Sequence, residues 1–242
     1  MNITSIHNEK VKLWLRLQEK KYRDETGCYI VEGDHLIAEA LKAHKVKEII
    51  SLTPSAFSPS YVVTPEILRK LSKQNSGTTC MAVCYKNDER PCQGGVAVLD
   101  GVQDPGNLGT ILRSALAFGI DTVCLGLDCV DLYNPKVIRS TEGMHFHLNV
   151  IRRDLDTFLP LLKKEGYTLY TTDVSKGERL DTISYSPFSA FLIGSEGQGV
   201  KKEHAILADK ALHIPMESSC ESLNVAVSAS ILFYEYRKGQ RL

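Results

Sequence analysis

The 242-residue sequence lacks any long apolar run. No stretch approaches the roughly 20 consecutive apolar residues of a membrane-spanning helix, and the first twelve residues lack the apolar centre of a signal peptide. Hydrophobic residues make up 43% of the chain and charged residues 24%, which is ordinary for a globular protein and unlike a disordered or fibrous one. We therefore expect a soluble, cytoplasmic protein with no membrane partner.

The sequence also lacks the usual signatures of metal and disulfide sites. Its seven cysteines are an odd number without a C-x-x-C pair, which disfavours a disulfide framework and a zinc site. His145 and His147 lie on a stretch that we predict to be strand-like, with no third ligand nearby. We interpret them as histidines without a metal-binding role and predict no metal.

Two nucleotide-binding motifs are missing. There is no G-x-x-x-x-G-K-[ST] phosphate loop, which disfavours a nucleoside triphosphate. A strand–turn–helix pattern at residues 96–118 would allow a dinucleotide-dependent oxidoreductase. However, the glycines of residues 194–199 have the wrong order for that fingerprint, and no fitting acidic residue follows.

Net charge is zero, so the chain has no overall surplus of Lys and Arg for phosphate contacts. The charge is nevertheless unevenly distributed. Residues 1–87 carry 13 Lys plus Arg against 9 Asp plus Glu, whereas residues 88–242 carry 16 against 20. The surplus positive charge lies in the first third of the chain.

The first third is predicted to be a small α/β domain. Residues 8–23 have the spacing of an amphipathic helix with a basic outer face, which is usually solvated surface. We predict a helix at residues 35–44, with strands on either side of it at residues 28–31 and 46–52.

A polar stretch rich in Pro and Gly, residues 86–95, then marks a boundary. We predict a domain at residues 1–87, a linker at residues 88–95 and a second domain at residues 96–242.

The second domain alternates short apolar strands with helices, which predicts an α/β fold with a parallel sheet and helices on both faces. The predicted strands are residues 96–102, 122–127, 167–172, 190–193 and 211–214, and the predicted helices include residues 108–118 and 155–165.

Three segments of this domain could carry chemistry. In the first, a strand ends in a tight turn, and a helix begins near residue 108. Asn107 stands where it could cap that helix, and Arg113 could be a surface charge, so each residue has a structural reading beside a functional one.

In the second segment, an apolar strand enters a loop with three glycines around Glu196, and these glycines let backbone approach a ligand closely. In the third, Ser222 or Asn224 could cap a terminal helix that is apolar around nearly its whole circumference. A helix of that kind suggests a subunit interface.

Taken together, these segments resemble the three motifs of the SpoU (TrmH-like) branch of the SPOUT RNA 2′-O-ribose methyltransferases. The matching patterns are N-x-G-x-x-x-R at residues 107–113, G-x-E-G-x-G at 194–199, and I-P-M with S-L-N within 214–224. Residues 134–140 also match a stretch found between the first two motifs. Residues 29–37 resemble the small substrate-binding domain that many of these enzymes carry.

The resemblance implies a fold, a cofactor and partners. It implies a SPOUT fold with a C-terminal trefoil knot, a homodimer, and transfer of a methyl group from S-adenosylmethionine to a ribose 2′-hydroxyl of RNA. The methyl donor would lie against Gly194, Ile214 and Leu223, held largely by backbone groups. We favour ribosomal RNA over transfer RNA because the chain has a separate front domain and no long basic tail.

The resemblance also assigns catalytic roles. Arg113 would orient the hydroxyl and the phosphate and assist deprotonation, and Asn107 would position the same ribose or phosphate. Glu196, Ser222 and Asn224 would complete the pocket and hold Arg113.

The chain departs from the family pattern at residues 141–147, where Glu142 and Met144 replace small residues. The alternatives are a transfer-RNA 2′-O-methyltransferase and a non-catalytic RNA-binding protein of the same fold.

Overall fold

The computed structural model describes residues 1–72, 77–172, 177–217 and 219–240, which form two compact units. Unit 1 comprises Met1–Asp88 and Asp131–His147, and unit 2 comprises Glu89–Val130 together with the chain from Leu148 onward. We predicted that residues 96–242 form one domain. In the structure, residues 131–147 instead pack with the first unit.

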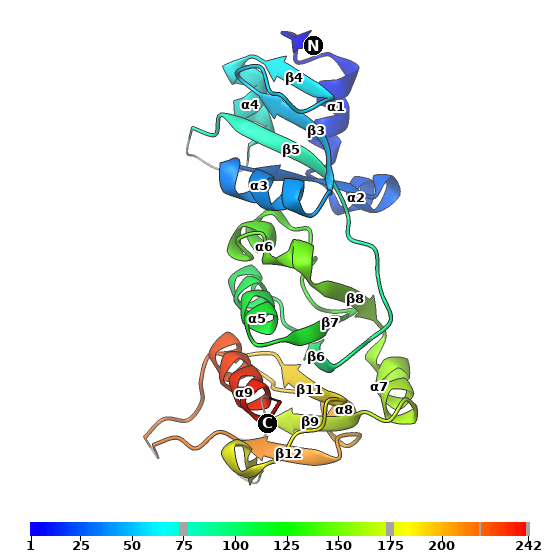
Figure 1. Cartoon of the computed structure of the whole chain (residues 1–242), viewed down its shortest axis with the longest axis vertical. Coiled ribbons are helices and arrows are strands. Elements are labelled where there is room, and N and C mark those ends of the chain that lie inside the picture. Colours follow the sequence, from blue (N-terminus) through cyan, green and yellow to red (C-terminus); the bar gives the residue numbers. More distant parts are fainter. Residues whose placement is uncertain (73–76, 173–176, 218, 241–242) are drawn as a thin grey trace. The chain divides into compact units, whose positions relative to one another are not determined.

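Unit 1 is a five-stranded mixed sheet between two layers of helices (Figure 1). Its strands are β1 (Asn2–Ile3), β2 (Cys28–Glu32), β3 (Val46–Ser51), β4 (Ser60–Val63) and β5 (Cys80–Tyr85), in the order β1-β4-β3-β5-β2. Its helices are α1 (Glu9–Arg16), α2 (Lys20–Thr26), α3 (Asp34–Lys42), α4 (Pro65–Leu71), α6 (Pro135–Ser140) and the 3₁₀ helix η1 (Met144–His147).

Helices α1 and α4 bury their apolar sides on one face of this sheet, and α3 and α6 cover the other face. The indole of Trp14 is buried and donates from Nε1 to Glu48 on β3 at 2.6 Å. Lys10 pairs with the same carboxylate at 2.7 Å, so the buried acid is fully compensated.

The single helix predicted at residues 8–23 is wrong, because the chain breaks into α1 and α2. The guanidinium of Arg23 is buried and donates to the carbonyl oxygens of Leu17 and Gln18 at 3.0 and 2.8 Å. These carbonyl oxygens accept hydrogen bonds from a side chain, so they do not continue the backbone hydrogen bonds of the helix.

The strand-like interpretation of residues 145–147 is also wrong, because these residues lie in η1. His145 is fully buried between Tyr29 and Thr141. Its Nε2 lies 2.8 Å from the hydroxyl of Tyr29, and its Nδ1 lies 2.8 Å from the hydroxyl of Thr141. His147 instead pairs with Glu39 at 2.9 Å.

Unit 2 is a seven-stranded parallel sheet. Its strands are β6 (Gly95–Asp100), β7 (Ile120–Gly126), β8 (Asn149–Arg153), β9 (Thr168–Thr172), β10 (Glu178–Arg179), β11 (Ser189–Gly194) and β12 (Lys210–His213), in the order β10-β12-β9-β11-β6-β7-β8. Its helices are α5 (Pro105–Ala117), α7 (Leu155–Lys164), α8 (Lys202–Ala205) and α9 (Val225–Gly239), with a 3₁₀ turn η2 (Leu180–Thr182).

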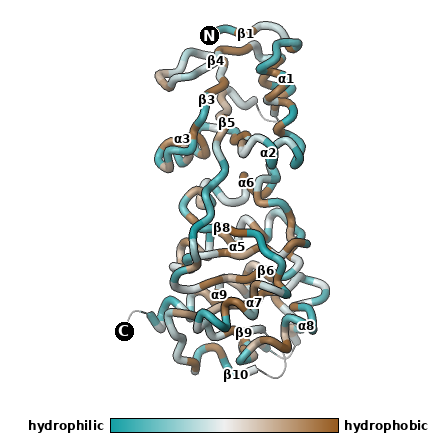
Figure 2. The backbone as a smooth tube through the Cα atoms, turned by 90° about the vertical axis from the view of Figure 1, so that its right-hand side faces the viewer, coloured by the Kyte–Doolittle hydropathy of each residue, from teal (hydrophilic) through white to brown (hydrophobic). Residues whose placement is uncertain are grey.

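Helices cover both faces of this sheet, as predicted. Alternate side chains of β11 point to opposite sides: Leu192 packs in the cluster with Leu159 of α7, whereas Phe191 contacts Phe233 of α9. Helices α5 and α9 lie on one side and α7 on the other (Figure 1). The central strands β6 and β11 are therefore buried and apolar over most of their length, and β6 is coloured as hydrophobic in Figure 2.

The strand order places a switch point between β6 and β11. From β6 the chain proceeds outward through β7 and β8, crosses to β9 on the other side, and returns to β11 beside β6. Ligands of open parallel sheets bind outside the carboxyl ends of strands at such a point.

Candidate active site

The glycine-containing loop, residues 194–200, leaves the carboxyl end of β11 and folds back on itself. Ser195 and Gly199 exchange two backbone hydrogen bonds, of 3.1 and 2.9 Å. A Cβ placed on Gly194 would lie 1.8 Å from the carbonyl carbon of Gly199, so no side chain fits there. Gly199 has a φ of +67°, which also favours glycine. A close backbone crossing thus requires glycine at position 194, and the backbone conformation favours it at position 199.

A cavity of about 470 Å³ lies beside this loop. The carboxyl ends of β9, β11 and β12 form its floor, and the first turns of α9 form one wall. Its lining is mainly apolar, with several backbone and hydroxyl groups; the apolar members include Ile193, Val200, Leu212, Ile214, Met216, Leu223, Val225 and Leu232.

The structure brings together at this cavity five of the residues singled out from the sequence. Gly194, Ile214 and Leu223, which were predicted to hold the cofactor, all line it, and so do Glu196 and Ser222. They come from two of the three motif segments, residues 194–199 and 214–224, which meet because the parallel strands β11 and β12 present their carboxyl ends at one edge of the sheet.

Asn107 is not the cap of α5, which corrects the capping interpretation. The helix begins one turn earlier, with Asp104 as its N-cap: the Asp104 Oδ1 accepts a hydrogen bond from the backbone N–H of Asn107 at 2.8 Å. The amide side chain of Asn107 is therefore available for other contacts. It donates from Nδ2 to the carboxylate of Glu196.

Asn224 completes a hydrogen-bonded group with Asn107 and Glu196. Its Nδ2 donates to Oδ1 of Asn107 at 2.9 Å, while its own Oδ1 accepts from the backbone N–H groups of Ala226 and Val227. Asn224 is thus the N-cap of α9 and a site residue at the same time. This group, Asn107–Glu196–Asn224, links all three motif segments.

Arg113 is not part of this group. Its side chain is exposed, does not line the cavity, and makes no hydrogen bond or ion pair with any residue in the described part of the chain. Residues six positions apart on an α-helix point in directions about 120° apart, so Arg113 and Asn107 occupy different sides of α5. The expectation that the pocket residues hold Arg113 is not met within a single chain.

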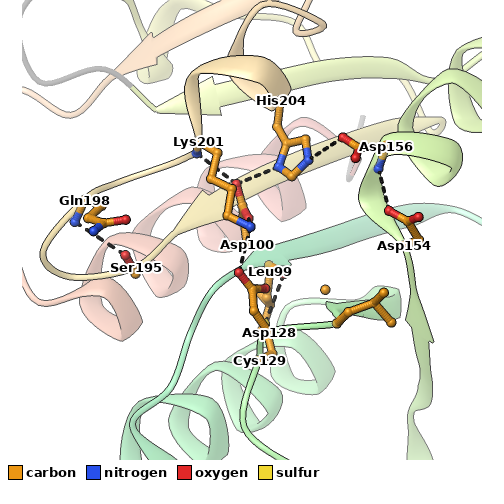
Figure 3. A network of polar contacts seen from close by, with 12 residues as sticks. Leu99, Asp100, Asp128, Cys129, Asp154, Asp156, Ser195, Gln198, Lys201 and His204 are labelled. Carbon is orange, nitrogen blue, oxygen red and sulfur yellow. Dashed lines mark hydrogen bonds and ion pairs between the residues drawn. The ribbon is translucent and has the colours of Figure 1, made fainter.

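Sequence analysis missed a second polar group beside the glycine-containing loop. Buried Asp100 and His204 form a polar network there with the partly exposed Lys201, shown in Figure 3. The hydrogen bond from Lys201 lowers the pKa of the neighbouring Asp128 carboxyl. The sequence feature that could have indicated this group is Asp100, a carboxylate at the end of the otherwise apolar β6.

No group of three or more metal-ligating side chains occurs among the described residues. Likewise, none of the helices in the described ranges is long and apolar enough to cross a membrane.

Comparison with known families assigns both parts of the chain. The SpoU rRNA methylase family matches residues 95–234, and the MRM3-like substrate binding domain matches residues 8–82.

Three similar proteins agree with these matches. The 23S rRNA (guanosine(2553)-2′-O)-methyltransferase RlmP of Bacillus subtilis is 37% identical, over 97% of this chain and 98% of the relative. An RNA 2′-O ribose methyltransferase structure matches with a TM-score of 0.83 and 30% identity, over the full length of both chains. An AdoMet-bound rRNA methyltransferase from Sinorhizobium meliloti matches with a TM-score of 0.88 and 26% identity, over 100% of this chain and 98% of that one. The chain belongs to the SpoU rRNA methylase family.

Proposed function

We propose that this chain methylates a ribose 2′-hydroxyl of RNA, with S-adenosylmethionine as the donor. The observation that carries the proposal is the Asn107–Glu196–Asn224 group standing beside the cavity lined by Gly194, Ile214 and Leu223. The site therefore combines a pocket large enough for the donor with polar groups able to hold a ribose.

The cavity fits the donor in size and chemistry. Its volume of about 470 Å³ lies within the range of roughly 300–1,000 Å³ of small-molecule pockets. Apolar side chains such as Ile214 and Leu223 can contact an adenine ring, while the glycine-containing loop exposes backbone groups. When bound, S-adenosylmethionine supplies an electrophilic methyl group on a sulfonium.

The chain's own residues must align and deprotonate the hydroxyl, which is a poor nucleophile at neutral pH. Glu196 lines the cavity, and Asn107 holds one of its carboxylate oxygens. We propose that Asn107 positions the ribose, with Ser222 and Asn224 completing the pocket. Arg113 orients the hydroxyl and the adjacent phosphate and assists deprotonation.

We propose ribosomal RNA as the substrate and the cytoplasm as the location. The support comes from the relative named as a 23S rRNA methyltransferase, which matches this chain over nearly its full length. The match of residues 8–82 to a substrate-binding domain adds a surface for RNA outside unit 2.

A homodimer and a C-terminal trefoil knot complete the proposal. Val227 and Tyr234 of α9 are 46% and 50% exposed and stand on one side of the helix with the half-buried Ile231. A second copy of the chain would cover this apolar stripe. We propose that the dimer also lets Arg113 reach the cavity of the partner subunit, because it does not reach the cavity of its own chain.

Methyl transfer from labelled S-adenosylmethionine to ribosomal RNA tests the reaction. We expect label at one nucleotide of unmodified RNA, and none when that nucleotide carries a 2′-deoxyribose. RNA binding without incorporation of label would favour the non-catalytic alternative.

A further inference from the structure

The glycine-containing loop is tied at both ends to one residue, Asp100, through strand pairing of its backbone at Gly194 and through its buried carboxylate at Lys201. Asp100 ends β6 and pairs in register with Gly194, where the loop begins. At the other end, Oδ2 of Asp100 accepts the backbone N–H of Lys201 at 2.8 Å (Figure 3). Residues 195–200 are therefore a closed loop whose base is held by Asp100.

His204 holds this carboxylate in place. Its Nδ1 lies 2.8 Å from the same Oδ2 of Asp100, and because a carboxylate can only accept, this nitrogen donates. Its Nε2 lies 3.2 Å from Oδ1 of Asp156, which is largely exposed. The imidazole is almost entirely buried, so it is fixed between the two acids.

Burying the Asp100 carboxylate costs free energy, so its presence at the end of β6 calls for a compensating role. The Asp100 side chain has no exposed surface, and its Oδ1 has no hydrogen-bond partner within the described ranges. Lys201 offsets part of the charge, with Nζ 3.7 Å from Asp100 and 2.7 Å from Asp128. An apolar residue would continue β6 at lower cost, so the benefit must lie in what the carboxylate holds.

We infer that Asp100 and His204 are positioning residues that hold the glycine-containing loop in its donor-binding form. Gln198, Gly199 and Val200, which immediately precede Lys201, line the donor cavity. Release of Lys201 from Asp100 would therefore open one wall of the cavity. The inference rests on the proposed function for the identity of the donor.

Two substitutions at His204 separate its two hydrogen bonds. The side-chain nitrogen of Asn stands as many bonds from Cα as Nδ1 of histidine, so His204→Asn retains a donor to Asp100. By the same count, Gln matches Nε2, so His204→Gln retains only the contact with Asp156.

The first readout is equilibrium binding of S-adenosylmethionine and S-adenosylhomocysteine by calorimetry. Loss of a hydrogen bond to a charged group is expected to weaken donor binding about 10- to 100-fold in His204→Gln. His204→Asn should stay within about threefold of wild type, since its bond to Asp100 is retained. At saturating donor, kcat should be nearly the same in both variants.

The second readout is amide hydrogen exchange of residues 195–201 without donor. Exchange should accelerate in His204→Gln and remain slow in His204→Asn, with the rest of unit 2 unchanged. Equal donor affinity and equal exchange in the two variants, whether both normal or both impaired, would overturn the inference.

The two readouts also distinguish this inference from the proposed function. If wild-type protein bound no S-adenosylmethionine while the loop still loosened only in His204→Gln, the role of Asp100 would stand and the donor assignment would fail.

Discussion

Asn224 shows how one residue can satisfy two interpretations at once. Its oxygen caps α9 and its nitrogen binds Asn107, so capping and site formation use opposite ends of the same amide. The sequence could predict that Asn224 is either a cap or a site residue, but not that it is both. For Asn107 the capping interpretation failed, because Asp104 lies one turn earlier and also has a side chain suited to capping.

Substitution of Arg113 tests the catalytic role that remains a prediction. We expect Arg113→Ala to lower methyl transfer by about 100- to 10,000-fold, the usual loss when a proton-transfer group is removed. Donor binding should be nearly unchanged, since Arg113 does not line the cavity of its own chain and its proposed contacts are with the hydroxyl and the phosphate of the RNA. Single-turnover transfer to RNA, together with calorimetry, measures both.

Arg179→Ala provides the matched control, because Arg179 is another exposed arginine of unit 2 and lies on β10. Wild-type rates in both variants would reject the role of Arg113.

His145 makes the stability of unit 1 depend on pH. Thr141 donates to a backbone carbonyl, so its oxygen is free to accept from Nδ1 of His145, and Tyr29 then donates to Nε2. Burial, with a smaller contribution from His147, lowers the pKa of His145 from 6.5 to about 3. The folded protein therefore keeps the ring neutral, whereas the unfolded chain protonates it near pH 6.5.

The sign of the effect follows from this depressed pKa. The stabilisation is complete above about pH 6.5 and is lost as the pH falls towards 3, by at most about 1.4 kcal/mol per pH unit. Between pH 6.5 and 5, the free energy of unfolding should fall by about 2 kcal/mol more in wild type than in His145→Gln, which cannot titrate. Urea unfolding of both proteins measures the difference, and parallel pH curves would contradict it.

Among the elements, the glycine-containing loop depends most strictly on backbone contact. In Gly194→Ala, the new Cβ would collide with the backbone at Gly199, and the loop must move. We expect donor affinity to fall by about 10-fold or more, as for an overpacked site. Calorimetry with S-adenosylhomocysteine measures the change.

Gly197→Ala is the control from the same loop, because a Cβ there meets no atom within 4 Å. If both alanine variants bound the donor like wild type, the close crossing would not matter for the cavity.

The elements that could be predicted are those whose sequence pattern matches their surroundings. The strands β6 and β11 are buried on both faces, and their continuous apolar runs indicated this directly. The break after α1 could not be predicted, since it depends on Arg23 reaching back to carbonyls five and six residues earlier. Residues 131–147 also have an ordinary local pattern, and only tertiary packing assigns them to unit 1.

For the whole molecule, the site is a product of topology. Three motif segments far apart in sequence meet because the switch point gathers the carboxyl ends of β6 and β11. The motifs predicted residues that line the cavity and residues that form the Asn107–Glu196–Asn224 group. They did not identify Asp100 or His204, which act through hydrogen bonds to a loop end and have no spacing that marks them.

The assembly state gives a prediction at this scale. Wild-type protein should sediment near twice the 26.9 kDa mass of the chain, and Tyr234→Asp should shift it towards one copy, because a charge would be buried in the interface. Leu161→Asp on α7 is the control, since Leu161 is similarly exposed at 46%. A wild-type monomer, or a Tyr234→Asp dimer, would contradict this interface.

Ribose methylation of cellular ribosomal RNA tests the central claim most directly. Mapping 2′-O-methyl groups in cells with and without the gene should show one position that loses its methyl group when the gene is absent. That position should regain it with the wild-type gene but not with Arg113→Ala. Identical methylation maps of ribosomal RNA with and without the gene would contradict the account.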